Sequence, residues 1–86
     1  METVGYTFEN AVADATKLAS SLTNEEKLKL YALYKQATVG DVNTPAPSYF
    51  DFTGSAKWKA WSELKGKAQE CAKSEYAELV STFIHL

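Results

Sequence analysis

The sequence lacks several residue types on which common kinds of chemistry depend. It contains no arginine, so every cation is a lysine, and an anion would meet flexible point charges instead of planar guanidinium groups. Catalysis through an arginine clamp is therefore excluded. The only histidine, His85, lies beside the last residue and is a poor general base. The only cysteine, Cys71, has no second cysteine for a disulfide or a metal site, and we predict that it is a small apolar filler in a helix.

Signals for phosphate loops, membrane spans and secretion are also missing. The sequence contains neither of the usual glycine-rich phosphate-binding motifs. No apolar run approaches the roughly 20 residues that span a membrane, and the N-terminus carries no signal-peptide pattern. The net charge of -2 attracts neither nucleic acid nor an anionic membrane to the protein as a whole. We expect a cytoplasmic protein without a cofactor, a metal site or catalytic residues, in which any anion site is local.

The sequence does contain enough apolar residues for a packed core. Apolar residues make up 45% of the 86 positions and aromatic residues 13%, which is typical of a folded domain. The length suits a single domain over residues 1–86. Helical spacing recurs in four stretches and strand alternation is not convincing, so we predict an all-α fold, a four-helix bundle.

The first two helices have clear start signals. Thr7 is a suitable N-cap for a first helix, whose apolar stripe extends over residues 8–22. Thr23-Asn-Glu-Glu26 has the sequence of a capping box, in which the threonine and glutamate side chains satisfy backbone donors reciprocally. The second helix should therefore start there and end near Val39, before Gly40.

Aromatic residues dominate the third helix, and the fourth carries the last core stripe. The third is expected over about Gly54–Lys65, with Trp58 and Trp61 on one face and Gly66 as its stop. The fourth repeats buried-type residues at helical spacing nearly to the end of the chain: Ala72, Tyr76, Leu79, Val80 and Phe83.

The connection between the second and third helices is unusually long. Residues 40–53 show no helical period, and connections of more than about twelve residues are uncommon in small domains and often functional. We expect two prolines to stiffen it and three aromatic residues to pin it to the body of the protein: Pro45, Pro47, Tyr49, Phe50 and Phe52.

The second helix presents two different faces. Its core stripe consists of Leu30, Leu33, Tyr34 and Ala37. About a quarter turn away lie Leu28, Tyr31 and Lys35, with Tyr34 on the border. An apolar residue, a ring with a hydroxyl and a cation in one line would match a ligand with an apolar part, a ring and an anion. Taken singly, the tyrosines have an ordinary explanation as core residues and the lysines as solvated ones, and we retain it for Lys29, Lys59 and Lys67.

Long runs of sequence resemble the acyl-CoA-binding protein (diazepam-binding inhibitor) family. The runs are Tyr-Ala-Leu-Tyr-Lys-Gln-Ala-Thr-Val-Gly-Asp from Tyr31 to Asp41, Asp-Phe-Thr-Gly-Ser-Ala-Lys-Trp-Lys-Ala-Trp from Asp51 to Trp61, and Leu64-Lys-Gly66. The match covers almost the whole chain without an evident insertion. It implies a four-helix bundle of the acyl-CoA-binding protein type, in which residues 1–86 form a single acyl-CoA-binding domain.

The resemblance also implies the role of each site residue. Tyr31 would hydrogen-bond toward the phosphates of the ligand, Tyr34 would stack on adenine and Lys35 would pair with the ribose 3′-phosphate. Lys57 would support the head group from the third helix and Tyr76 would contact the ligand from the fourth. Ala32 and Leu33 lie within the binding run but are expected to be mainly structural. Leu28 is expected to make a weaker contact with the acyl chain.

Three positions depart from the family pattern. Thr16 stands where a basic residue is common, which would lower affinity for the head group. Leu22 replaces a common proline, and Lys27 replaces a common apolar residue at the groove. The change at Lys27 would alter the contact with the acyl chain and its preferred length.

The implied function is a cytosolic, monomeric carrier and pool former for medium- and long-chain fatty acyl-CoA, which delivers its ligand to acyl-CoA-using enzymes. The resemblance also allows a peptide or receptor-ligand signalling role, although no dibasic processing site or secretion signal is present. Because related modules occur attached to enzymes, a thioesterase or isomerase is a third alternative. We expect no enzymatic activity, since the chain leaves no room for a catalytic domain.

Overall fold

Side-chain caps fix the start of the first two helices in the computed structural model, which describes residues 6–84. Helix α1 (Phe8–Leu18) starts where the Thr7 hydroxyl accepts a hydrogen bond from the Asn10 backbone N–H at 3.1 Å. A 3-10 turn, η1 (Ala19–Ser21), leads to α2 (Asn24–Thr38). The capping box predicted at residues 23–26 is present, with bonds of 3.1 and 2.9 Å. It satisfies two backbone donors of α2 that otherwise have no partner within the helix.

An unpredicted N-cap, Asp51, places the start of the third helix earlier than expected. The Asp51 carboxylate accepts from the Gly54 N–H at 2.9 Å, so α3 (Phe52–Ser62) starts two residues before the expected Gly54. After the turn that follows, α4 covers Gln69–Ile84. The prediction for Gly40 holds, because Gly40 follows the end of α2 with φ of +98°, which glycine adopts without steric cost. Gly66 also has a positive φ, +94°, but α3 ends at Ser62 and not near Lys65, so Gly66 is not its stop.

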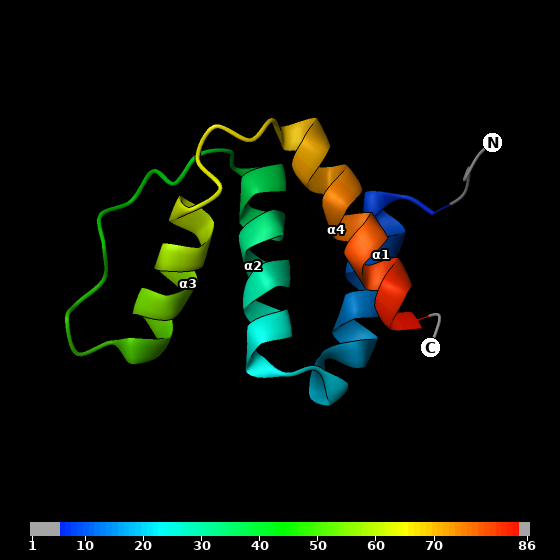
Figure 1. Ribbon diagram of the computed structural model, residues 1–86, viewed down its shortest axis with the longest axis horizontal. Helices are drawn as coiled ribbons and strands as arrows, with labels where there is room; N and C mark the ends of the chain where they lie inside the picture. Colours follow the sequence, from blue (N-terminus) through cyan, green and yellow to red (C-terminus); the bar gives the residue numbers. More distant parts are fainter. Residues whose placement is uncertain (1–5, 85–86) are drawn as a thin grey trace.

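The prediction of an all-α four-helix bundle is confirmed, since no strand occurs within residues 6–84. Helix α2 is central: it packs against α3 on one side and α4 on the other, and α1 packs against α4 (Figure 1). The predicted loose terminus at residues 1–5 and His85 lie outside the described residues. No helix in the described chain combines the length and hydropathy needed to cross a membrane.

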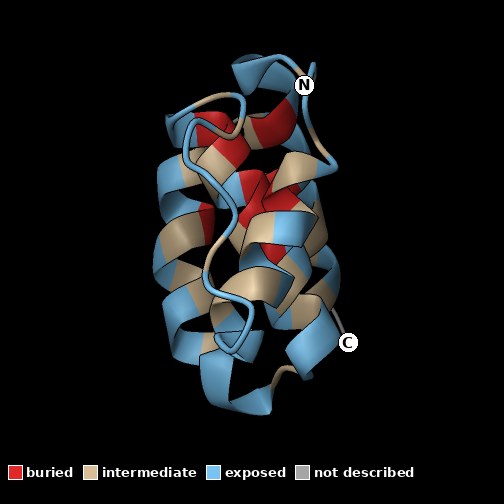
Figure 2. Ribbon diagram, turned by 90° about the vertical axis from the view of Figure 1, so that its left-hand side faces the viewer, coloured by how far each residue is buried: buried red, intermediate tan, exposed pale blue. Residues whose placement is uncertain are grey.

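The long connection between α2 and α3 follows from the direction of the helices. Helices α2 and α3 run the same way, as Figure 1 shows, so the chain must return along the whole of α2 before α3 can begin. With 15 residues, α2 is about 22 Å long. Figure 2 shows this return as an exposed strip of chain across the front of the molecule.

The core is built on apolar residues that the helical spacing predicted. Buried side chains come from α1, α2 and α4: Ala11, Leu30, Leu33, Ala37, Ala72, Tyr76 and Val80. Helix α3 contributes the buried Trp61, which packs outside this cluster. Leu79 and Phe83, expected in the stripe of α4, are only partly buried against the core.

Cys71 is exposed, so the prediction that it fills the core is wrong. The buried positions of α4 are Ala72, Tyr76 and Val80, which follow one another every four residues. Cys71 precedes the first of them and is therefore rotated by about 100° away from that stripe. Helical phase, and not side-chain chemistry, determines where this thiol lies.

The three aromatic residues of the long connection do not pin it to the protein, contrary to the prediction. Tyr49, Phe50 and Phe52 are 86, 80 and 79% exposed. The two indoles of α3 hold the connection instead: Trp58 Nε1 donates to the Thr44 carbonyl at 2.9 Å and Trp61 Nε1 to the Gly40 carbonyl at 2.8 Å. Hydrogen bonds to the backbone thus fix the start of the connection and leave its later rings in solvent.

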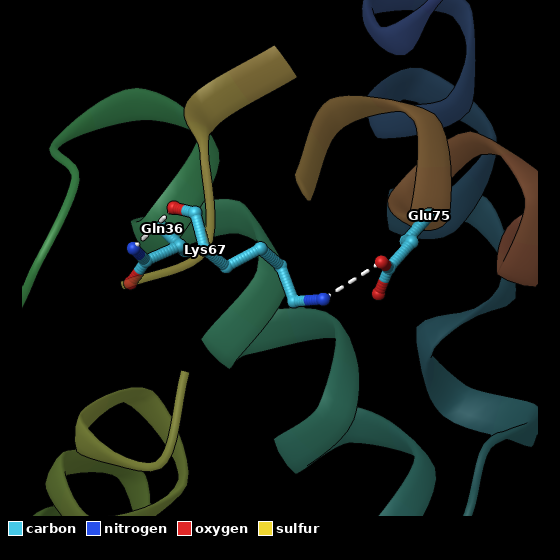
Figure 3. A network of polar contacts seen from close by, with 3 residues as sticks. All are labelled: Gln36, Lys67 and Glu75. Atoms are coloured by element: carbon cyan, nitrogen blue, oxygen red, sulfur yellow. Dashed lines mark hydrogen bonds and ion pairs between the residues drawn. The ribbon is translucent and has the colours of Figure 1, made fainter. Parts of the chain in front are cut away.

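A buried amide joins the end of α2 to two loops. Gln36 has no exposed surface, and its Nε2 donates to Asp41 Oδ1 at 2.9 Å and to the Lys67 carbonyl at 2.8 Å. Lys67 Nζ in turn lies 2.7 Å from a carboxylate oxygen of Glu75 on α4 (Figure 3). Asp41 Oδ1 also accepts from the Gly66 N–H at 2.8 Å. This network fixes both chain turns that leave α2 and lead into α4.

We predict that Gln36→Ala lowers the free energy of unfolding by about 2–3 kcal/mol, because it leaves the Lys67 carbonyl without its donor and opens a cavity. Urea denaturation measures this change. Gln69→Ala is the matched control, since Gln69 Nε2 also donates to a backbone carbonyl, that of Ala37, but the residue is exposed. Its cost should stay below about 1 kcal/mol. Equal losses in both variants would contradict the role given to Gln36.

Asp41 should make the fold sensitive to acid. The Gly66 N–H and then the Gln36 amide stabilise its carboxylate and hold the pKa below its ordinary value. A carboxyl group with a lowered folded-state pKa stabilises the fold above its unfolded pKa and loses that contribution as pH falls through the folded pKa. Between about pH 5 and pH 2.5, unfolding free energy should therefore fall less steeply in Asp41→Asn than in the wild type. Parallel slopes in urea titrations across this range would contradict the assignment.

Candidate acyl-chain and anion site

Two lysines lie on aromatic rings at the contact between α2 and α3. Lys57 Nζ of α3 is 5.5 Å from the ring centroid of Tyr31, and Lys35 Nζ of α2 is 4.9 Å from that of Trp61. Residues 31 and 35 are one turn apart on α2, as are 57 and 61 on α3, so the pairs form successive steps between parallel helices. Each contact holds a long side chain in place without neutralising its charge.

Neither lysine has a carboxylate partner within residues 6–84, where the ion pairs are Lys67 with Glu75 and Lys73 with Glu70. Lys35 and Lys57 thus keep their full charge for another anion. The two lysines that we predicted to be ordinary surface residues on the same helices, Lys29 and Lys59, are exposed.

Three aromatic rings from three helices, α1, α2 and α4, form a cluster. Phe8 of α1 stacks with Tyr34 of α2, with centroids 6.0 Å apart and planes at 24°. Tyr76 of α4 meets Phe8 edge to face at 5.1 Å. Tyr34 is 40% exposed, whereas Tyr76 is only 4% exposed. Burial, and secondarily the nearby Tyr34, raises the pKa of Tyr76, so its hydroxyl stays a neutral hydrogen-bonding group at physiological pH.

Two apolar hollows, which together we call the trough, lie beside these groups: Tyr31, Tyr34 and Tyr76 line the first and Lys57 the second, whereas Lys35 lines neither. A hollow of about 300 Å³ lies between α1 and α2, and a second of about 330 Å³ lies between α2 and α3. Lys27 lines both, so it stands where they meet. The first is lined by Val12, Ala15, Thr16, Ala19, Leu22, Lys27, Leu30, Tyr31, Tyr34 and Tyr76, and the second by Asn24, Lys27, Leu28, Thr53, Ala56 and Lys57.

The three departures noted in the sequence all line this trough. The Thr16 hydroxyl donates to the Val12 carbonyl at 3.1 Å within α1 and supplies no charge. Leu22 adds apolar wall, while Lys27 brings a cation to the junction of the two hollows. The lysine stem can lie along apolar surface while its ammonium group reaches water.

A larger cavity, of about 660 Å³, lies on the opposite side of α2, and it contains two of the residues expected in the binding run. Ala32 and Leu33 are buried and line this cavity, away from Tyr31 and Lys35. Its rim carries Glu63, Glu75 and Glu78 against the single Lys29, and these carboxylates would repel an anionic head group. We therefore assign the candidate site to the smaller, lysine-edged trough. Leu28 lines both spaces.

Two contributors to the site were missed in the sequence. Phe8 packs against the core, as the stripe of α1 predicted, and it also stacks on the exposed Tyr34, a contact that was not predicted. Trp61 was assigned to the helix face only, but its ring holds Lys35. The four-residue spacing that Trp61 shares with Lys57, matching that of Tyr31 and Lys35, was the available signal. Within residues 6–84, no three histidine, cysteine, aspartate or glutamate side chains are grouped to hold a metal ion.

This arrangement defines a class of protein: a small helical binding domain whose apolar trough has uncompensated lysines and tyrosine rings at its edge. It matches an amphiphile with an anionic, ring-containing head.

Comparison with known proteins supplies the family. The family model described as acyl CoA binding protein matches residues 6–80. Acyl-CoA-binding protein homolog 1 of Caenorhabditis elegans is 49% identical over 77 residues, which are 90% of this chain and 90% of that protein. The crystal structure of Oryza sativa acyl-CoA-binding protein 2 is 42% identical, with a TM-score of 0.86 and coverage of 90% of this chain and 86% of that one. The chain therefore belongs to the acyl-CoA-binding protein family, and the resemblance identified in its sequence is confirmed.

One relative places the same module within a larger protein. Human enoyl-CoA delta isomerase 2 is 48% identical over 75 residues, which are 87% of this chain but 19% of that protein. This chain thus corresponds to a small part of the isomerase, whereas it covers most of the relatives named for acyl-CoA binding.

Proposed function

We propose that this protein binds medium- and long-chain fatty acyl-CoA esters in the lysine-edged trough and carries them, chemically unchanged, to enzymes that use them. The observation that supports this most directly is the pair of lysines, Lys35 and Lys57, which lie on aromatic rings and have no carboxylate partner within residues 6–84; Lys57 also lines an apolar hollow. In this proposal the protein acts as a cytosolic monomer, without a cofactor.

The head group would be bound by charge from both helices. Lys35 pairs with the ribose 3′-phosphate, Lys57 supports the phosphates from α3, and the Tyr31 hydroxyl donates a hydrogen bond to them. Hydrogen bonds to charged groups contribute about 1.5–3 kcal/mol each, roughly twice the neutral value. The cation–π contacts improve this further, because they order each lysine before the ligand arrives and so reduce the entropy lost on binding.

Adenine would stack on Tyr34. The ring of Tyr34 is 40% exposed, and it stacks on Phe8 with a centroid distance of 6.0 Å. Adenine would extend this aromatic stack. Stacking of a base on an aromatic side chain is worth about 1–3 kcal/mol, if single-stranded nucleic acids are a fair guide. Tyr76 supports Tyr34 from behind at 6.3 Å.

The acyl chain would fill the apolar hollows, with Leu28 as one contact. Each buried methylene contributes about 0.8 kcal/mol, so four additional methylenes add roughly 3 kcal/mol, or about two decades of affinity. Affinity should level off once the chain is longer than the trough. Ala32 and Leu33, buried on the other face of α2, contribute by packing and hold Tyr31, Tyr34 and Lys35 in register.

We propose no catalytic step, because the trough holds no general base beside a nucleophile. The polar residues that line it are lysines, tyrosines, an asparagine and two threonines, of which Thr16 is bonded within its own helix; burial raises the pKa of one of the tyrosines, Tyr76. We do not extend the proposal to receptor signalling, since no contact in residues 6–84 points to a receptor.

We predict that replacing both site lysines weakens binding of palmitoyl-CoA about a hundredfold, roughly tenfold for each lysine, because each supplies one charge-assisted contact. Isothermal titration calorimetry compares Lys35→Ala/Lys57→Ala with Lys29→Ala/Lys59→Ala, which removes the same charge from the same two helices outside the trough. The control pair should keep wild-type affinity. Equal loss in both pairs would mean that net charge alone attracts the ligand, and no loss in either would exclude this site.

We predict that alanine substitution of two leucines distinguishes the trough from the larger cavity as the site of the acyl chain. Leu28→Ala should weaken palmitoyl-CoA about tenfold while leaving the affinity for free CoA unchanged, because it removes apolar contact and no charge. Leu79→Ala is the control, since Leu79 lines only the larger cavity on the opposite side of α2. If Leu79→Ala weakens binding as much as Leu28→Ala does, the chain occupies the larger cavity, which both leucines line, and the assignment is wrong.

A further inference from the structure

The protein carries an aromatic tip, Tyr49, Phe50 and Phe52, whose exposure has no explanation within the fold. All three rings are at least 79% exposed, far above any other large apolar side chain of the described residues; the next, Val39 and Ile84, are 42 and 41% exposed. Adjacent exposed apolar side chains are unusual on a soluble domain and mark a contact surface. Here nothing in residues 6–84 covers them.

The tip is an ordered turn, which holds its rings outward. The Asp51 N–H donates to the Ser48 carbonyl at 2.9 Å and the Phe50 N–H to the Ser48 hydroxyl at 3.3 Å. Asp51 then caps α3 through the Gly54 N–H. Tyr49 and Phe50 meet edge to face, with centroids 5.5 Å apart. The turn and the cap together fix the backbone that carries the rings.

The charge around the tip identifies the kind of surface it suits. From Val42 to Ala56 the only charged side chain is Asp51, and its carboxylate is engaged in the helix cap. A tip without cations is poorly suited to anionic lipids or to nucleic acid. Tyrosine and phenylalanine, with apolar bodies and in tyrosine a polar hydroxyl, are the side chains that favour the interface between lipid head groups and acyl chains.

The tip also adjoins the trough. It leads directly into the first two turns of α3, where Thr53, Ala56 and Lys57 line the hollow between α2 and α3. A surface touched by the tip would therefore face this end of the trough. In Figure 1 the connection bends back at its lowest point and enters α3 there, at the margin of the molecule.

We propose that the aromatic tip inserts into the interface of an electrically neutral phospholipid bilayer and sets the α2–α3 end of the trough against it. The benefit of this contact rests on the proposed function: an acyl chain that leaves a bilayer could pass into the trough without crossing water. Lipid contact itself needs only the tip.

Co-sedimentation with phosphatidylcholine vesicles tests the contact directly, using the full chain without ligand. Tyr49→Ser/Phe50→Ser/Phe52→Ser should lower the partition coefficient at least about tenfold, because three rings no longer leave water. The control variant Val39→Ser/Ile84→Ser removes exposed apolar residues elsewhere and should partition like the wild type. Binding should not require phosphatidylserine, although Lys57, at the hollow set against the bilayer, can add to it when anionic lipid is present.

Several results would overturn the proposal. They are a wild type that does not sediment with the vesicles, a triple variant that sediments equally well, or binding that appears only with phosphatidylserine at low salt. Self-association of the wild type in ultracentrifugation, lost in the triple variant together with an absence of vesicle binding, would show that the tip binds a second copy instead. Phe50→Ser alone, with a smaller expected loss, guards against misfolding of the triple variant.

Calorimetry with palmitoyl-CoA in the absence of vesicles separates this inference from the proposed function. The triple variant should keep wild-type affinity, since its rings are not among the residues that line the trough. If the variant loses acyl-CoA affinity and the wild type does not bind vesicles, the tip closes over the ligand and the membrane contact is wrong. If the wild type binds vesicles through the tip but binds no acyl-CoA, the proposed function fails and the lipid contact stands.

Discussion

The buried carboxamide of Gln36 is the interaction on which the arrangement of this fold depends. Its single NH₂ group satisfies the carboxylate of Asp41, just beyond α2, and the carbonyl of Lys67, just before α4. One side chain thereby fixes the direction in which the chain leaves the central helix and the place where it comes back. The indole of Trp61 bonds the Gly40 carbonyl in the same region, so α3 is positioned from the same end. The lysine and ring pairs between α2 and α3 require that register.

Different faces of helix α2 serve the core and the proposed binding site. Its buried Ala32 and Leu33 line the larger cavity, while Tyr31 and the exposed Tyr34 line the trough proposed for binding. The same 15 residues therefore contribute both to the core and to the proposed site. Aromatic rings replace carboxylates as neighbours of the site lysines, and this choice holds the lysines in place while leaving their charge available.

Local sequence rules predicted most of the fold because most of its signals are local. The cap at Thr7, the capping box at Thr23 and the stop at Gly40 involve residues within one turn of each other, and the structure has all three. The errors arose where distant parts of the chain decide. Cys71 is exposed because of the phase of α4 against the core, and the rings of the aromatic tip are exposed because Trp58 and Trp61 had already secured the connection. The burial of Gln36 and the contact of Phe8 with Tyr34 likewise join residues from separate elements, which no periodicity contains.

Because α3 packs mainly against α2, its local stability should depend on whether a ligand occupies the trough. Among the helices, α3 packs extensively only against α2, and the rest of its support comes from hydrogen bonds to the connecting chain. Such an element opens locally at a lower free energy than the helices that share the central core. A molecule that contacts α2 and α3 together binds only the closed form, and it suppresses opening of α3 in proportion to its affinity. Amide hydrogen exchange in α3 would therefore act as an internal gauge of ligand saturation.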